Sequence, residues 1–196
     1  MKRMLLLCVC AIAVLAFGAV AVQADDDHPG SEAEHASCVT ATGGDDDAQG
    51  GDDNSATGER EGTDQGDDEH GSGQDDVIDG NAGDDDIAGE AGDDDLCGDQ
   101  GDDHLSGGRG NDKIAGGAGD DVENGGAGDD DLEGDRGDDR MTGGTGVDTI
   151  LAGAGNDRVF ARDHRRDHIS CGSGVDTVVA DRGDSVAASC EHVSRG

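Results

Sequence analysis

A repeat of nine residues runs without a gap from residue 80 to residue 160 and limits what this chain can fold into. Nine units follow one another, and in every unit the fourth residue is Gly and the sixth is Asp. The eighth residue is apolar in eight units, the exception being Glu123. Compositional bias toward Gly and Asp would not hold three positions in register over nine units, so the repeat marks a structural unit.

The spacing inside a unit predicts a turn followed by a short strand. The stretch Gly-x-x-Gly-x-Asp suits a tight turn, because glycine accepts positive φ. The remaining three residues suffice for one strand with its central side chain inward, but not for a helix. Two units then make one coil, and stacked coils pair their strands in parallel. We therefore predict an all-β parallel β-roll over residues 71–160, with 71–79 as a degenerate first unit.

In such a stack the sixth-position aspartates form two ladders, because alternate units lie on the same side of the roll. Neighbouring carboxylates repel by about 1 kcal/mol per pair in water and by more when desolvated. A divalent cation between turns replaces this repulsion with coordination by carboxylate and carbonyl oxygens, and calcium tolerates irregular oxygen sites better than magnesium. The predicted calcium ligands are Asp85, Asp94, Asp103, Asp112, Asp121, Asp130, Asp139, Asp148 and Asp157.

The charge of the chain indicates that a cation is needed for folding. Its 196 residues include 48 Asp and Glu against 13 Lys and Arg, a formal net charge of −35, and its only aromatic residues are Phe17 and Phe160. High charge with low hydrophobicity favours disorder unless the charge is neutralised. We therefore expect metal binding and folding to be coupled. A surface this acidic also repels phosphate, which argues against a nucleic-acid partner.

The pattern Gly-Gly-x-Gly-x-Asp-x-U-x, where U is a large apolar residue, resembles the hemolysin-type calcium-binding repeat of RTX (repeats-in-toxin) proteins. The resemblance covers residues 80–160 in full and 71–179 with degenerate units. It implies a right-handed parallel β-roll with calcium in its turns, the nine aspartates bridging ions between stacked turns. The departures are Val147 at the fifth position, Glu123 at the eighth, and Asn81, Glu90, Asp99 and Asp135 at the second. We expect a local defect near Glu123, where Val122 could turn inward instead.

The flanking segments give the domain organisation. Residues 1–24 have a basic start, an apolar stretch and small residues before an acidic run, the layout of a cleaved secretory signal peptide. A retained membrane anchor is the alternative. Residues 25–70 are acidic and Gly-rich, which predicts a disordered tail, although Gly62–His70 looks like a decayed repeat with Glu69 at the inward position. Residues 161–196 predict a C-terminal cap with degenerate repeats.

Four cysteines follow the predicted signal peptide. Cys171 and Cys190 are the natural disulfide pair in an oxidising compartment, because about one coil separates them. A loop of that size would stabilise the fold by about 3 kcal/mol in the chain-entropy model. Cys38 and Cys97 either pair with each other or remain as free thiols.

No motif in the chain predicts catalysis. His164 and His168 have a zinc-like spacing without the adjoining Glu of a metalloprotease, and neither a Gly-x-Ser-x-Gly elbow nor a phosphate loop occurs. We expect neither an enzyme nor a small-molecule substrate site. The sequence predicts a secreted, extracellular protein whose roll folds on binding calcium. Two alternatives keep the fold: a calcium-rigidified cell-surface spacer or adhesive module with an unidentified surface partner, and the non-catalytic RTX portion of a toxin or protease system.

Overall fold

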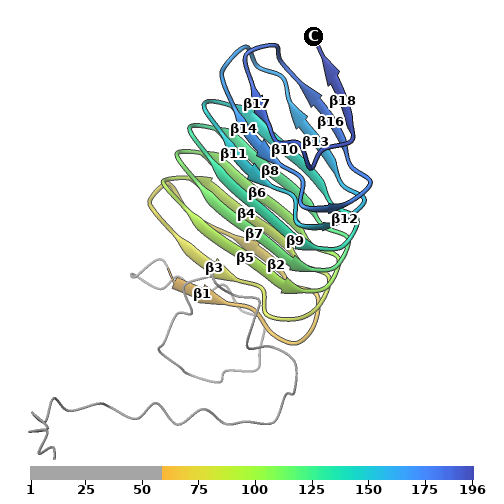
Figure 1. Ribbon diagram of the computed structural model, residues 1–196. Helices are drawn as coiled ribbons and strands as arrows, with labels where there is room; N and C mark the ends of the chain where they lie inside the picture. The colour runs from red at the N-terminus through yellow and green to blue at the C-terminus, as the bar shows by residue number, and fades with distance from the viewer. Residues whose placement is uncertain (1–58) are drawn as a thin grey trace, which may run out of the picture. The chain divides into compact units, whose positions relative to one another are not determined.

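The computed structural model describes residues 59–196, which form two parallel β-sheets stacked coil upon coil (Figure 1). Each regular coil gives one strand to each sheet, and no helix occurs within residues 59–196. Accordingly, nothing in this range is a helix that could cross a membrane. The predicted signal peptide at residues 1–24 and most of the predicted acidic tail lie outside the described residues.

The two sheets take alternate strands of the chain, and all pairings are parallel. The first sheet contains, in spatial order, β1 (Glu59–Glu61), β3 (Val77–Asp79), β5 (Asp95–Gln100), β7 (Lys113–Ala118), β9 (Asp131–Arg136), β11 (Thr149–Leu151), β14 (His168–Ser170) and β17 (Ser185–Val186), with β12 (Ala154–Gly155) and β15 (Ser173–Gly174) beside them. The second contains β2 (Asp68–His70), β4 (Asp86–Ala91), β6 (His104–Arg109), β8 (Val122–Ala127), β10 (Arg140–Thr145), β13 (Arg158–Ala161), β16 (Thr177–Ala180) and β18 (His192–Arg195).

The register confirms the predicted coil of two nine-residue units. Asp86 pairs with His104 in the second sheet, a separation of 18 residues that recurs along most of the stack. Near the C-terminal end the separation becomes 19, where Thr149 pairs with His168. The additional residue belongs to the run 161–170, which has ten residues instead of nine. The predicted all-β parallel roll is therefore confirmed.

Eighth-position side chains form the core as two columns, one behind each sheet. Alternation along a short strand turns this central residue inward and its two neighbours outward. The buried members of the columns are Ile78, Leu96, Ile114, Leu132, Ile150 and Ile169 in the first sheet, and Ile87, Leu105, Met141, Val159 and Val178 in the second. Because each coil repeats the same contact, the core grows by one large side chain per strand.

The roll begins earlier than the sequence predicted. Strands β1 and β2 lie within residues 59–70, which the prediction assigned to the tail. Asp68 pairs with Asp86, and Glu69 pairs with Ile87 at the inward position of its strand. The tail prediction is thus wrong for residues 59–70, because backbone pairing to the next coil maintains the register even where the inward side chain is polar.

The prediction of a local defect near Glu123 is also wrong. Strand β8 keeps its register, with Glu123 paired to Leu105 on one side and Met141 on the other. The Glu123 side chain lies inside at 1% exposure, while Val122 stays on the outward face. A one-residue slip would have moved every side chain of β8 to the opposite face and broken the pairing to both neighbouring strands.

Candidate metal sites in the turns

The sixth-position aspartates are buried in the turns, and one oxygen of each is fixed by the coil before it. The backbone N–H of Asp103 donates to Oδ1 of Asp121 at 2.8 Å, and that of Asp94 donates to Oδ1 of Asp112 at 2.9 Å. The same bond spans 18 residues throughout both predicted ladders, which are Asp85, Asp103, Asp121, Asp139 and Asp157, and Asp94, Asp112, Asp130 and Asp148.

The two aspartate ladders contain more residues than the sequence predicted. Asp76 donates its N–H to Oδ1 of Asp94 at one end. At the other end, Oδ1 of Asp167 and Oδ1 of Asp176 accept from the preceding ladder members at 3.0 Å. Asp76 and Asp176 could have been found from the degenerate units 71–79 and 171–179, in which each stands at the sixth position. Asp167 is displaced from the nine-residue frame by the additional residue of the ten-residue run.

A second set of side-chain bonds runs in the opposite direction along the exposed fifth positions. Oδ1 of Asp93 accepts the backbone N–H of Asn111, and Oδ1 of Asn111 accepts that of Asp129. Sequence reasoning did not assign this role, although the fifth residue is Asp or Asn in eight of the nine units. Val147 is the exception: its N–H donates to Asp129, but its side chain offers no acceptor to the coil that follows. The fifth and sixth positions together tie each regular turn to both neighbours.

The other carboxylate oxygen, Oδ2, is buried without a hydrogen-bond donor in every one of the nine predicted ligands. These residues are Asp85, Asp94, Asp103, Asp112, Asp121, Asp130, Asp139, Asp148 and Asp157, and Asp176 shares the property. An unsatisfied buried acceptor costs about 1–3 kcal/mol, and more when it is charged. A row of such atoms in two ladders therefore requires a compensating group, and a cation is the chemistry that suits them.

In eight of the nine predicted ligands this oxygen faces the first-position glycine of its own unit, the exception being Asp157. A Cβ built on Gly89 would lie 2.4 Å from Oδ2 of Asp94 and 2.9 Å from the carbonyl oxygen of Gly107, one coil further on. On Gly98 it would lie 2.3 Å from Oδ2 of Asp103. We call the space beside such a glycine, lined by the Oδ2 atom of its unit, a glycine cradle. The cradles belong to Gly80, Gly89, Gly98, Gly107, Gly116, Gly125, Gly134 and Gly143.

The donor set of a glycine cradle fits calcium. Carboxylate and backbone carbonyl oxygens approach the same point from neighbouring coils, and Ca²⁺ takes roughly six to eight such oxygens in flexible geometry. Within residues 59–196 no three His, Cys, Asp or Glu side chains are grouped as a metal site. In the cradles of Gly89, Gly98 and Gly125, one carboxylate oxygen and one backbone carbonyl oxygen are among the atoms nearest to the glycine.

Burial raises the pKa of the ladder carboxyl groups. Desolvation of the charged form raises the pKa of Asp139 to about 8 and those of Asp121 and Asp130 to about 7. The bond from the preceding coil's backbone N–H acts in the opposite direction, and neighbouring ladder carboxylates raise the pKa further. Without a cation the roll therefore holds protons at neutral pH that the same aspartates would release in an unfolded chain.

The ladder positions are not equivalent, because the cradles end at both ends of the roll. At the N-terminal end, Oδ2 of Asp76 accepts from the backbone N–H and the hydroxyl of Ser72. Toward the C-terminal end the first position is no longer glycine, and Ala152 adds a methyl group in the unit of Asp157. The buried first-position residues of the last coils are Ala152, Ala161, Cys171, Ala180 and Cys190. The structure thus separates Asp157 from the other eight predicted ligands.

The predicted disulfide between Cys171 and Cys190 is present and links two successive coils, with a Cα–Cα distance of 5.2 Å. It joins side chains in the region where the coils lack glycine cradles, so a covalent bond and apolar contacts hold this end together. Cys97 is also disulfide-bonded, so the free-thiol alternative does not hold for it. Cys38, its predicted alternative partner, lies outside the described residues.

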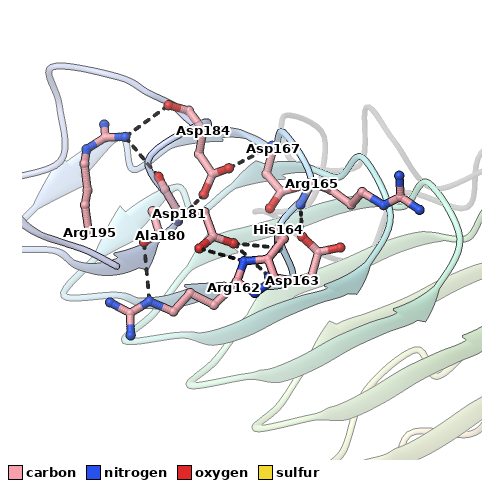
Figure 2. Close-up of polar contacts among 9 residues, drawn as sticks. All are labelled: Arg162, Asp163, His164, Arg165, Asp167, Ala180, Asp181, Asp184 and Arg195. Carbon is pink, nitrogen blue, oxygen red and sulfur yellow. Dashed lines mark hydrogen bonds and ion pairs between the residues drawn. The ribbon is translucent and has the colours of Figure 1, made fainter.

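Within residues 161–196 the carboxylates of Asp181 and Asp184 are satisfied by protein donors (Figure 2). Oδ2 of Asp181 accepts the backbone N–H groups of Asp163 and His164, at 3.0 and 2.7 Å, and these bonds lower its pKa. The guanidinium group of Arg195 donates to the carbonyl oxygens of Asp181 and Asp184. His164 stands at positive φ in this turn, and its exposed side chain places Nδ1 3.6 Å from Oδ1 of Asp181.

A family profile, the RTX calcium-binding nonapeptide repeat (4 copies), matches residues 61–96, 98–132 and 124–159, together half of the chain. The chain belongs to this RTX family. The matched RTX repeats include all eight glycine cradles and stop before the disulfide-linked coils. No curated protein matches the chain.

Proposed function

We propose that this RTX roll binds calcium ions in its glycine cradles and folds on binding them. The observation that carries the proposal is the row of buried Oδ2 atoms without donors, eight of them beside a first-position glycine. The RTX repeat family supports calcium as the ion. We expect half-saturation at roughly 10⁻⁴ to 10⁻³ M calcium, the range of extracellular calcium modules.

Coupling between binding and folding follows from the burial of the ladders. In the unfolded chain the aspartates are hydrated and apart, whereas the metal-free roll must bury them together. Their buried oxygens lose water without gaining a donor, which opposes folding. Calcium removes this cost in the folded state alone, so its binding free energy contributes directly to folding.

A glycine substitution tests the cradle itself. Neither Gly107 nor Gly73 has positive φ, so alanine is sterically allowed by the backbone at both positions. A Cβ on Gly107 would lie 2.3 Å from Oδ2 of Asp112, whereas a Cβ on Gly73 would have no atom within 4 Å. We expect Gly107→Ala to bind fewer calcium ions by isothermal titration calorimetry and to need more calcium to fold, measured by far-UV circular dichroism. Gly73→Ala is the control, and identical titrations of the two variants would reject the cradles as sites.

We also propose that the protein is secreted and acts outside the cell without a catalytic role. The signal-peptide layout of residues 1–24 supports export, and the Cys171–Cys190 disulfide fits an oxidising compartment. Mass spectrometry of the protein recovered from the medium tests this, because cleavage after Ala24 predicts an N-terminus at Asp25. The biological role of the calcium-bound roll stays a prediction. The alternatives are a cell-surface spacer or adhesive module and the non-catalytic RTX portion of a toxin or protease system.

A further inference from the structure

Glu123 is the one residue in the RTX-matched units 80–160 that places a carboxylate in the inward column. It lies in β8 between the apolar side chains of Leu105 and Met141, and it is 1% exposed. Neither of its carboxylate oxygens has a hydrogen-bond partner of regular geometry, and a backbone N–H that acts on the carboxyl group belongs to Gly116. Burying a carboxylate in this way is costly unless a charged partner compensates for it.

The side chain of Glu123 reaches into a glycine cradle. A Cβ on Gly116 would lie 2.5 Å from Oδ2 of Asp121 and 2.7 Å from Oε1 of Glu123. In the cradle of Gly98 on the same side of the roll, the corresponding second oxygen is a backbone carbonyl, that of Gly116, at 2.7 Å. The second-nearest oxygen is thus a carboxylate oxygen in the cradle of Gly116 and a neutral carbonyl oxygen in the cradle of Gly98.

We infer that Glu123 is a calcium ligand, so that the cradle of Gly116 holds its ion with two carboxylate side chains instead of one. The inference rests on the proposed calcium binding and assigns an additional ligand to one of its sites. The affinity of calcium sites rises with the number of charged ligands. Asp121 and Glu123 together neutralise both charges of one divalent ion, so this cradle is the strongest calcium site of the roll.

The competing explanation is that Glu123 is a buried acid that takes no part in calcium binding. The two explanations predict opposite effects for Glu123→Leu in the full chain, because leucine restores the apolar column between Leu105 and Met141. If Glu123 is a ligand, the variant binds one calcium ion fewer by isothermal titration calorimetry, and the calcium midpoint of folding rises. If it is only a buried acid, the calcium stoichiometry is unchanged and the midpoint falls, which overturns the inference.

Glu123→Gln gives a second measurement should the leucine variant fold poorly. The amide keeps an oxygen ligand and the shape of the side chain but removes the charge. We expect an unchanged stoichiometry with an affinity lower by roughly tenfold at this site, the size of effect seen for partners that tune metal sites. Calcium binding by Glu123→Gln as tight as that of the wild type would overturn the inference.

Glu69 provides a matched control. It occupies the same inward column in β2, next to Ile87, and its Oε2 atom is likewise buried without a partner. For a Cβ on Gly62, however, the three nearest atoms are all backbone atoms of Gly80. We expect Glu69→Leu to keep the full calcium stoichiometry and to lower the folding midpoint. A wild-type chain without calcium binding would overturn the proposed function, whereas tighter binding by Glu123→Leu alone would overturn only this inference.

Discussion

The backbone N–H of Asp112 donates a 2.9 Å hydrogen bond to Oδ1 of Asp130, one coil further along the roll. The second oxygen of the same carboxylate, Oδ2 of Asp130, has no donor and lies against the cradle of Gly125. One half of the side chain therefore ties two coils together, and the other half is directed toward the proposed cation. An amide at this position separates the two roles, because it keeps the acceptor and removes the charge.

We expect Asp130→Asn to have opposite effects with and without calcium. In saturating calcium the free energy of unfolding should fall by about 1–3 kcal/mol, because a charged ligand is lost. In a chelator it should rise, because an unpaired buried carboxylate has been removed. Urea unfolding in the two conditions measures both changes. Asp84→Asn is the control, since Asp84 is exposed and its Oδ1 accepts a backbone N–H in the same way; equal behaviour of the two variants would contradict the assignment.

The raised pKa values predict that the metal-free roll is more stable in acid than at neutral pH. The ladder aspartates bind protons more tightly in the folded chain than in the unfolded chain, so this stability is complete below pH 4 and is lost as the pH rises through 6 to 8. Circular dichroism in a chelator should show β-structure decreasing over that range. With calcium present the dependence should reverse, because protons compete with the ion.

A substitution at Asp139 checks that the buried ladder causes this pH dependence. The pKa of Asp139 is about 8, so Asp139→Asn should weaken the loss of stability above pH 7 in the metal-free chain. Asp138→Asn removes the same charge from the neighbouring exposed position and should leave the curve close to that of the wild type. A pH dependence altered equally by both variants would assign the effect to overall charge.

Glu90 is held at φ 74, a left-handed conformation that the repeat usually fills with glycine. Such a conformation costs a residue with a Cβ about 1–2 kcal/mol, and glycine avoids that cost. We expect Glu90→Gly to unfold with a free energy about 1 kcal/mol higher than Glu90→Ala, measured in urea with calcium. Both variants remove the same charge, so the comparison isolates the backbone. Equal stability of the two would show that the coil relaxes at this position.

Replacing both Cys171 and Cys190 with alanine should lower the free energy of unfolding by about 3 kcal/mol. Alanine is the suitable replacement because Ala152, Ala161 and Ala180 already occupy the same position in other coils. Urea unfolding without reductant, in saturating calcium, measures the loss and leaves the bond at Cys97 intact. An unchanged unfolding midpoint would mean that apolar contacts alone close this end of the roll.

The periodicity of the sequence was sufficient to predict the coil, the parallel sheets, both aspartate ladders and the Cys171–Cys190 pair. It failed where the register breaks or the pattern is incomplete. Asp167 was overlooked because one inserted residue shifts it out of frame, and the coil before residue 71 was assigned to the tail because Glu69 is polar. Both errors come from reading each unit alone, although the backbone of a neighbouring coil fixes its position.

The sequence by itself determined which residues face the core and which aspartates share a ladder, because these properties follow from a local period of nine and the alternation of a strand. Only the tertiary structure decided that Glu123 stays inside, since pairing to Leu105 and Met141 holds β8 in register. It also decided which oxygen of each aspartate faces a cradle. The N–H of the preceding coil takes Oδ1 and leaves Oδ2, and that contact joins residues 18 positions apart.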